Sequence, residues 1–169
     1  MEVLFSAEEI AAKVKEMGAD ITRYYQGKDL TVIILASGGV FFGADLLRAI
    51  DLPLWVDTLG VASYVQDRSG GTLNVRSKLK LDCRGRHILL VDEVLDTGNT
   101  LRGIKKMLLE QGAESVRTAV IFSKPIERPP EVANADWTGF FAPDRYLVGY
   151  GLDSCELYRN LPYVGVLDK

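Results

Sequence analysis

The chain has 169 residues, of which 47% are hydrophobic and 25% charged, and its formal net charge is −3. This length and composition predict one soluble domain, residues 1–169, with a sizeable core. The slightly acidic balance argues against an extended basic surface for nucleic acid. No apolar run reaches the roughly 18 residues of a membrane span, and the N-terminus lacks the basic-then-apolar order of a secretion signal. We therefore expect a cytoplasmic protein that binds neither membrane nor nucleic acid.

The few cysteine and histidine residues predict neither a disulfide nor a metal centre built on them. Cys83 and Cys155 lie far apart and form no C-x-x-C pair, which argues against a disulfide or a zinc–thiolate site. His87 is the only histidine, so it completes neither a metal site nor a catalytic triad. We expect it to be a residue at the edge of a strand.

The first 60 residues show helix and strand patterns in alternation. A capping box, S-A-E-E at residues 6–9, and apolar residues at helical spacing predict a helix over 7–25. The β-branched apolar run over 30–36 is typical of a strand buried on both faces. A helical pattern follows over 40–50, and a second strand is expected over 54–59.

The next stretch is polar, basic and rich in glycine, and it predicts a mobile loop or ribbon over about 60–78. Buried strands are expected over 87–91 and 115–122, joined by a loop over 92–99 and a helix over 100–111. Short strands are expected near residues 137–140 and 146–149. Strand, turn, helix and strand in this order predict parallel βαβ units with right-handed crossovers.

The loop at 92–99 carries the most informative residues, because ligands of open α/β sheets bind at the carboxyl ends of strands. Gly98 permits an unusual backbone angle, and free amides opening a helix complete an anion cradle suited to a phosphate monoester. The adjacent acids Asp92 and Glu93 suit ribose hydroxyls or a magnesium ion shared with them. Side chains alternate across an extended backbone, so we expect that a strand would not let both acids face one ligand. The alternative is a solvated acidic turn, which the preceding buried strand and the following amphipathic helix disfavour.

The segment V-D-E-V-L-D-T-G-N-T, residues 91–100, resembles the 5-phosphoribosyl-1-pyrophosphate (PRPP) motif of type I phosphoribosyltransferases. Four further segments resemble the hypoxanthine-guanine branch of that family, and together they cover nearly the whole chain. These segments are residues 37–50, Ser63-Tyr64, Lys124-Pro125 and residues 140–167. The last segment is long and specific in the spacing of its Tyr146, Asp153 and Arg159.

The resemblance implies purine salvage, in which the 5-phosphoribosyl group of PRPP passes to N9 of hypoxanthine or guanine. The products would be IMP or GMP and pyrophosphate. Magnesium is the implied cofactor, because PRPP carries too much charge to be held and cleaved without it. The expected fold is a mainly parallel, five-stranded sheet flanked by helices, with a small hood from about residues 1–25 and 144–169. A homodimer or homotetramer is expected, and Phe41, Phe42 and Leu46 would lie at its interface or in the core.

The resemblance also assigns roles around the ribose phosphate. Asp92 and Glu93 would bind the ribose hydroxyls, directly or near the metal, and Asp96 would be the general base beside purine N7. The 5-phosphate would be held by Asp96, Thr97, Gly98, Asn99 and Thr100. Pyrophosphate would be bound by Ser37, Gly38, Gly39 and Arg159, with Asp153 reaching magnesium.

On the purine side, the resemblance makes Lys124 the donor to the 6-oxo group, which disfavours adenine. Tyr146 would stack on the base, since an aromatic face contributes about 1–3 kcal/mol to nucleobase binding. Leu147 would add backbone contacts to the base edge. Ser63 and Tyr64 would belong to a loop that closes over the site and excludes water.

Three residues depart from the family's usual pattern: Ser37 and Asn99 replace basic residues, and Glu93 replaces an aspartate. Relative to that pattern, Ser37 and Asn99 each remove a positive charge from a phosphate site. We therefore hypothesise that PRPP binds more weakly. Two alternative functions therefore stay open, a xanthine-preferring enzyme and a non-catalytic regulator that binds PRPP or a nucleotide. An ordinary dinucleotide or P-loop domain is disfavoured, because Gly38, Gly39 and Gly43 make no G-x-G-x-x-G and no G-K-[ST] follows.

Overall fold

A computed structural model describes residues 1–65 and 72–167; the side chains of residues 63–65 and 72 lie outside the described part. In chain order the elements are β1 (Glu2–Phe5), α1 (Ala7–Tyr25), β2 (Leu30–Ala36), α2 (Gly39–Ala49), β3 (Leu54–Val65), β4 (Thr72–Val75), β5 (His87–Leu95), α3 (Asn99–Glu110), β6 (Ser115–Ser123), the 3-10 helix η1 (Pro130–Val132), β7 (Trp137–Phe141), β8 (Leu147–Val148) and β9 (Val164–Val166). None of the helices in this part combines the length and apolar character that crossing a bilayer requires.

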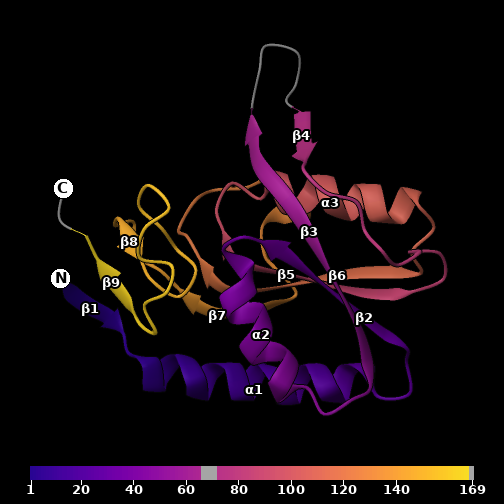
Figure 1. The fold of residues 1–169 in the computed structure, drawn as a ribbon, viewed down its shortest axis with the longest axis horizontal. Coiled ribbons are helices and arrows are strands. Elements are labelled where there is room, and N and C mark those ends of the chain that lie inside the picture. The colour runs from indigo at the N-terminus through magenta and orange to yellow at the C-terminus, as the bar shows by residue number, and fades with distance from the viewer. Residues whose placement is uncertain (66–71, 168–169) are drawn as a thin grey trace.

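The larger sheet has the strand order β4-β3-β2-β5-β6-β7 (Figure 1). Its five strands from β3 to β7 are mutually parallel, as the alternation of strands and helices predicted. The sixth strand, β4, pairs antiparallel with β3 and forms a ribbon that projects from the body of the molecule. The sheet is therefore one strand wider than expected, because part of the polar stretch at 60–78 is ordered as β4.

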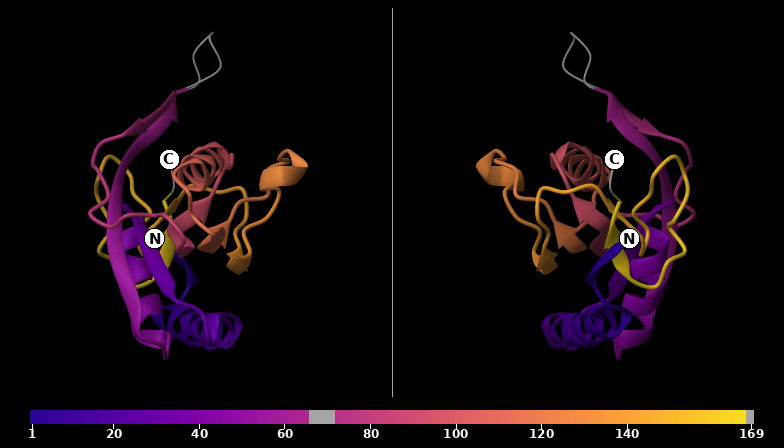
Figure 2. Two further views of the ribbon diagram at one scale, coloured as in Figure 1. Left: turned by 90° about the vertical axis from the view of Figure 1, so that its right-hand side faces the viewer. Right: turned by 90° about the vertical axis from the view of Figure 1, so that its left-hand side faces the viewer.

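Side chains that alternate along β2 build two separate hydrophobic cores, one on each face of the larger sheet. Leu30, Val32 and Ile34 belong to the core that α1 and α2 cover. Ile33 and Leu35 belong to the core that α3 covers. Figure 2 shows the resulting layers, with α3 on one side of the strands and α1 on the other. A strand buried on both faces reads as a continuous apolar run, which is why the sequence revealed β2 so clearly.

Helix α1 begins and ends where the sequence predicted. Ser6 Oγ accepts the backbone N–H of Glu9, and the Glu9 carboxylate accepts the backbone N–H of Ser6, completing the capping box. The same hydrogen bonds hold the pKa of Glu9 below its ordinary value. The buried residues of α1 recur at helical spacing, and they pack against α2 and the edge strand β7.

The two ends of the chain meet in a second, three-stranded sheet with the order β1-β9-β8, which lies at one end of the molecule in Figure 1. Glu2 pairs with Val166, and Leu147 pairs with the same residue from the other side. We expected residues 1–25 to belong to the hood, but only β1 joins this sheet. Helix α1 packs on the main core instead, because its apolar face matches that of α2.

Two strands are longer than the sequence indicated. β3 continues past residue 59 to Val65, and β5 continues past residue 91 to Leu95, so the expected loop at 92–99 shrinks to Asp96–Gly98. Asp92 and Val94 pair with Val120 and Phe122 of β6. The two acids interrupt the apolar pattern but not the strand, because backbone pairing does not require apolar side chains. Their side chains can be polar here since both residues line a cavity.

The apolar side chains of α2 divide between core and surface. Phe42 and Leu46 are fully buried, so they are core residues and not an exposed interface. Phe41 is partly buried, and its neighbour Val40 is exposed.

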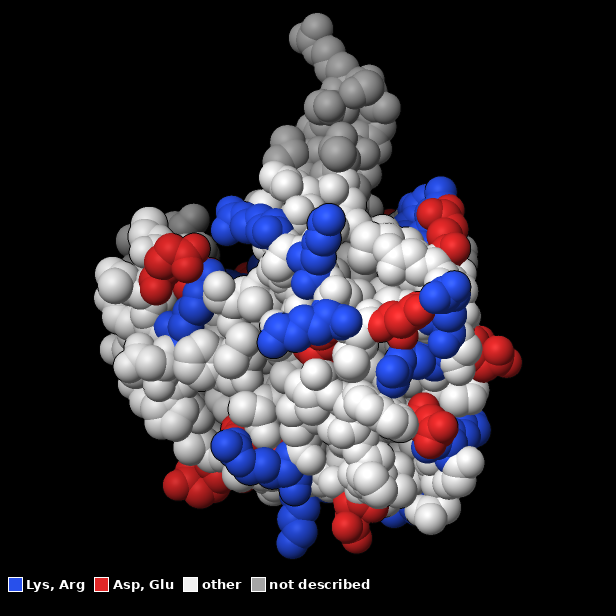
Figure 3. Space-filling view, turned by 45° about the vertical axis from the view of Figure 1, so that its right-hand side comes forward, with Lys and Arg blue, Asp and Glu red and all other residues white. Residues whose placement is uncertain are grey.

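On the face shown in Figure 3, lysine and arginine side chains are interspersed with acidic ones.

Candidate active site

The carboxyl ends of β2 and β5 form a crevice, because the chain leaves these adjacent strands in opposite directions. From β2 the chain enters α2 and returns as β3, whereas from β5 it enters α3 and returns as β6. Such a topological switch point is where open α/β sheets bind their ligands. A cavity of about 300 Å³ lies there. Its lining is Leu35, Ala36, Ser37, Gly38, Val61, Ala62, Asp92, Glu93, Val94, Leu95, Asp96, Thr97, Gly98, Thr100, Leu101, Asp153 and Arg159.

Asp92 and Glu93 both line this cavity, although they are consecutive residues of an extended strand. The expectation that a strand would keep them apart was therefore wrong, because the cavity lies over the strand's end and meets both of its faces. The backbone N–H of Glu93 donates to Asp92 Oδ1 at 2.9 Å. Burial and the neighbouring Glu93 carboxylate raise the pKa of Asp92. Two adjacent, partly buried acids are suited to accept hydrogen bonds from a pair of ligand hydroxyls.

Glycines let three separate segments meet around Glu93. A Cβ atom on Gly38 would lie 2.2 Å from Glu93 Oε1, and one on Gly151 would lie 2.2 Å from the Gly38 carbonyl oxygen. Gly151 also has a φ of +98°, which side chains disfavour. The Gly38-Gly39 pair thus lets this turn approach the end of β5 closely. The cis peptide bond in the same turn joins Ala36 to Ser37.

The predicted phosphate cradle has the expected backbone form. Gly98 adopts a left-handed conformation (φ 80°) immediately before α3, and its carbonyl accepts the backbone N–H of Arg102 at 2.9 Å. Thr97 Oγ1 accepts the backbone N–H of Asn99 at 3.3 Å. Thr97, Gly98 and Thr100 line the cavity, so the amides at the start of α3 open toward it. A helix N-terminus with such amides favours an anion.

Lys124 follows β6 directly and meets the phosphate loop. Its Nζ lies 3.2 Å from Asp96 Oδ2, and its backbone N–H donates to the Leu95 carbonyl at 3.0 Å. Asp96 was expected in a loop after a strand ending at residue 91, but it follows β5 directly, and its contact with Lys124 follows from the parallel pairing of β5 with β6. The structure therefore joins the expected base, Asp96, to the expected purine donor.

Arg128 holds these two strand ends together, although no sequence motif marks it. Its guanidinium donates to the carbonyl oxygens of Asp96, of Leu95 at 2.8 Å and of Lys124 at 2.7 Å. It also donates to the Ala133 carbonyl at 3.2 Å. Burial lowers the pKa of Arg128, though such a guanidinium stays charged near neutral pH. These carbonyl partners come from several segments of the chain, so no local sequence pattern marks this arginine.

Arg159 and Asp153 close the opposite end of the cavity. The Arg159 guanidinium lies 3.0 Å from Asp153 Oδ1 and 3.1 Å from Glu156 Oε2, and it donates to the Gly151 carbonyl at 2.6 Å. A loop brings residues 153 and 159 together, with positive φ at Cys155, Glu156 and Tyr158.

Four further expected residues are not among the described residues that line the cavity: Gly39, Asn99, Tyr146 and Leu147. Leu147 is buried in β8, and Tyr146 is partly exposed beside it, with its carbonyl accepting the Leu167 backbone N–H at 3.0 Å. Asn99 starts α3 without lining the cavity. Gly39 lies against Asp92, with its virtual Cβ 3.3 Å from Asp92 Cα. Ser63 and Tyr64 belong to β3, and their side chains lie outside the described part of the chain.

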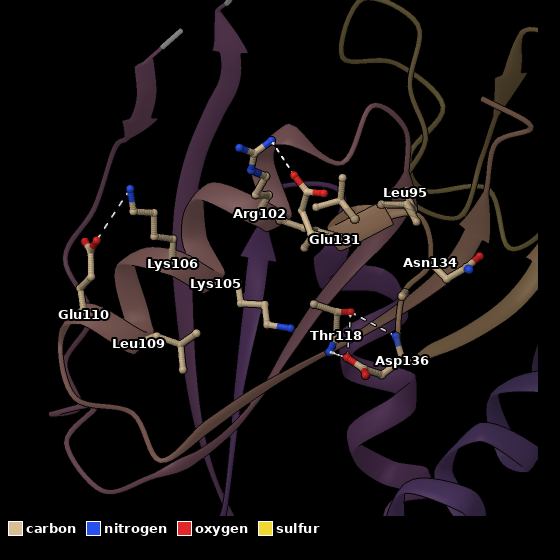
Figure 4. A pocket seen from close by; sticks show the side chains of 13 residues that line it. Leu95, Arg102, Lys105, Lys106, Leu109, Glu110, Thr118, Glu131, Asn134 and Asp136 are labelled. Atoms are coloured by element: carbon tan, nitrogen blue, oxygen red, sulfur yellow. Dashed lines mark hydrogen bonds and ion pairs between the residues drawn. The ribbon is translucent and has the colours of Figure 1, made fainter. Parts of the chain in front are cut away.

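A larger groove of about 670 Å³ lies between α3 and the residues of β6, η1 and the segment that precedes β7 (Figure 4). Its rim carries the ion pairs Arg102–Glu131 at 3.5 Å and Lys106–Glu110 at 3.8 Å, and Thr118 and Asp136 hydrogen-bond to each other within it. Two of its cations pair with acids of the same lining, and the groove contains neither the acid pair nor the cradle amides. The smaller cavity is therefore the candidate active site.

Comparison with known proteins supports this assignment. Residues 2–153 match the model of the phosphoribosyl transferase domain. The hypoxanthine-guanine phosphoribosyltransferases of Streptococcus pneumoniae and Bacillus subtilis are each 40% identical to this chain, over 99% and 98% of it and 93% and 92% of their own lengths. A Staphylococcus aureus hypoxanthine phosphoribosyltransferase structure superposes with a TM-score of 0.91 at 36% identity, covering 99% of this chain and 92% of its own. The Trypanosoma cruzi enzyme in complex with the product IMP gives a TM-score of 0.90 at 30% identity, covering 99% and 94%. The chain belongs to the hypoxanthine-guanine phosphoribosyltransferase family of type I phosphoribosyltransferases.

Proposed function

We propose that this protein transfers the 5-phosphoribosyl group from PRPP to N9 of hypoxanthine and guanine, forming IMP or GMP and pyrophosphate. The observation that carries the proposal is one cavity that joins the Asp92–Glu93 pair, the Thr97–Thr100 cradle and the Arg159–Asp153 pair. A sugar with hydroxyls, a 5-phosphate and a pyrophosphate needs these three kinds of group around it. The names of the bacterial relatives agree with this substrate.

In the proposed reaction the N9–C1′ bond forms while the bond from C1′ to the pyrophosphate oxygen breaks. Asp96 accepts the proton that leaves purine N7, and its carboxylate stabilises the positive charge that develops on the sugar. Lys124 donates to the 6-oxo group of the purine, which accepts a hydrogen bond where the amino group of adenine would not. Asp92 and Glu93 orient the ribose through its hydroxyls, and the cradle amides fix the 5-phosphate.

Magnesium fits this donor set as a substrate-borne ion. Within the described part of the chain, no three acidic, histidine or cysteine side chains gather closely enough to hold a metal by themselves. Mg²⁺ ordinarily keeps several waters and binds through one or two carboxylates together with substrate phosphates. Asp153 and the Asp92–Glu93 pair would supply such carboxylates at the two sides of the cavity. The ion would neutralise charge on the departing pyrophosphate.

A second copy of the chain is proposed to cover the exposed start of α2. A depression of about 420 Å³ lies there between α1 and α2, lined largely by apolar groups, and Val40 on its rim is 42% exposed. Light scattering should give the mass of a dimer or tetramer for the wild type and a smaller mass for Val40→Glu. A monomeric wild type at micromolar concentration would refute this.

Turnover of four bases tests the proposed function directly. The purified chain is mixed with PRPP, MgCl₂ and hypoxanthine, guanine, xanthine or adenine, and nucleotide formation is followed by absorbance. We expect hypoxanthine and guanine to react and adenine to stay unreacted, with Asp96→Asn lowering kcat by about 10²–10³-fold as the matched control. A faster reaction with xanthine would identify the xanthine-preferring alternative. Binding of PRPP without turnover of any oxopurine would identify a non-catalytic binder instead.

A further inference from the structure

A second cavity of about 430 Å³ continues the candidate active site past its Arg159 end. Its lining is Ala36, Ser37, Gly60, Val61, Ala62, Arg76, Asp153, Glu156 and Arg159. Ser37, Asp153 and Arg159 line both cavities, so the two form one elongated space. The cradle residues Thr97 and Gly98 line only the first of them. The second cavity is therefore the end away from the 5-phosphate, where the pyrophosphate of PRPP would lie.

The charges in this cavity are poorly arranged for a polyanion unless Arg76 takes part. Arg159 is already engaged with Asp153 and Glu156, and its side chain is only 19% exposed. Ser37 offers a hydroxyl and an amide but no charge. The exposed Arg76 is the other cation among the described lining residues, and none of the ion pairs found within the described part of the chain involves it. Its guanidinium is thus available to a ligand.

Backbone pairing fixes Arg76 beside the turn that contains Ser37. The Arg76 N–H donates to the Gly60 carbonyl at 2.7 Å, and the Gly60 N–H donates to Ser77 Oγ at 2.8 Å. Gly60 is in turn the register partner of Ala36, the residue before Ser37. Arg76, Gly60 and Ala36 therefore lie side by side on three neighbouring backbone segments, and Ser37 follows Ala36. A cation on such a frame is well placed to meet a ligand held by that turn.

We propose that Arg76 binds the pyrophosphate of PRPP and provides the cationic contact that Ser37 cannot. This rests on the proposed function, because it assigns that function's second phosphate subsite. A guanidinium can donate two parallel hydrogen bonds to phosphate oxygens, which an ammonium cannot. Arg76 is a binding residue here: it holds the substrate and the departing product and takes no part in proton transfer.

The test compares Arg76→Gln and Arg76→Lys with Lys78→Gln. Lys78 is an exposed cation two residues away that lines a separate depression. For Arg76→Gln we expect the KM for PRPP and the inhibition constant of pyrophosphate to rise about tenfold, with kcat and the KM for hypoxanthine changed less than twofold. Arg76→Lys should recover part of the loss. Lys78→Gln should match the wild type in every constant, and equal melting temperatures would show that the fold is retained.

A second experiment moves the positive charge from position 76 to position 37. The double variant Ser37→Lys, Arg76→Gln should bind pyrophosphate more tightly than Arg76→Gln alone, because the new ammonium enters the same cavity. Calorimetric titration with magnesium pyrophosphate measures this without turnover, so it still decides the role of Arg76 if the wild type forms no nucleotide. Equal pyrophosphate affinity in the wild type, Arg76→Gln and Lys78→Gln would overturn the proposal. Absent nucleotide formation with intact Arg76-dependent pyrophosphate binding would overturn only the proposed function.

Discussion

Lys124 Nζ lies 3.2 Å from Asp96 Oδ2, so the proposed purine donor and the proposed base form an ion pair with each other. Both side chains are partly exposed, at 33% and 48%, and an ion pair in such a setting contributes little to stability. A purine that binds between them would exchange this weak contact for hydrogen bonds at its 6-oxo group and N7. The pair therefore holds both groups in place at little cost to ligand binding.

Replacing Lys124 with methionine should separate base recognition from PRPP recognition. A hydrogen bond to a charged group is worth about 1.5–3 kcal/mol, so the KM for hypoxanthine should rise roughly tenfold to a hundredfold. The KM for PRPP should stay within about twofold, because the Thr97–Thr100 cradle is untouched. Steady-state kinetics with each substrate varied in turn would measure both constants. A shift in the PRPP constant alone would contradict the assignment of Lys124 to the purine.

Alanine substitutions of Gly38 and Gly151, the two glycines around Glu93, should affect different properties: substrate binding for Gly38 and stability for Gly151. In Gly38→Ala the new methyl group meets the end of a flexible side chain, so Glu93 can move aside. The melting temperature should change by less than about 2 °C, while the KM for PRPP rises as Glu93 leaves the ribose site. In Gly151→Ala the methyl group meets the Gly38 carbonyl at a φ of +98°, which should cost on the order of 2–4 kcal/mol and lower the melting temperature roughly 5–10 °C.

Gly103→Ala is the matched control for both glycine variants. It lies inside α3, where an added Cβ makes only ordinary contacts at 3.5–3.7 Å, and alanine favours a helix over glycine. We expect unchanged kinetics and a melting temperature equal to or above that of the wild type. If Gly151→Ala melted like Gly103→Ala, the close approach of the 151 turn to Gly38 would not matter to the fold.

Arg128→Met should lower both stability and activity. The substitution removes the donor that four carbonyls share. Those of Leu95 and Lys124 keep a backbone partner, whereas those of Asp96 and Ala133 lose this donor, and a buried polar group without a partner costs about 1–3 kcal/mol. We expect the free energy of unfolding to fall by about 2–4 kcal/mol in urea titrations. The comparison variant is Arg84→Gln, an exposed arginine paired only with Asp82, for which the change should stay below about 0.5 kcal/mol. Equal losses in the two variants would refute a specific role for Arg128.

The two thiols should react at very different rates. Cys155 is exposed, whereas Cys83 is 4% exposed and burial raises its pKa, so less of it is thiolate at pH 7.5. A thiol reagent such as DTNB should modify one cysteine quickly in the native protein and the second only after unfolding in urea. Cys155→Ser should abolish the fast phase. Two fast thiols in the wild type would contradict the burial of Cys83.

The sequence predicted the parts of the fold whose signals are local. The capping box at Ser6 and the continuous apolar run of β2 are read from neighbouring residues, and the structure confirms both. The end of β5 was missed because Asp92 and Glu93 interrupt the apolar pattern, although their backbones still pair with β6. Strand β4 was expected only as an unspecified loop or ribbon, because this stretch alternates weakly between apolar and polar residues.

The residues of the candidate site likewise fall into those that a local sequence pattern reveals and those that it does not. The 91–100 motif is contiguous, so its cradle, acids and Gly98 could all be named from the sequence. Arg128 and Arg76 could not, because each acts through carbonyls or cavity walls contributed by distant strands. A cation in a polar loop looks the same in sequence whether it faces water or a ligand. Only the register of β2, β3 and β4 shows which of the loop cations reaches the cavity.

The pairing of Glu2 with Val166 has a consequence for the order of events during synthesis. β1 is made before the rest of the domain, and its partner strand β9 follows more than 150 residues later. The turn that carries Gly151, Asp153 and Arg159 lies just before that partner strand. The half of the cavity that these residues build therefore forms only after the strands of the larger sheet have been made, when β9 pairs with β1.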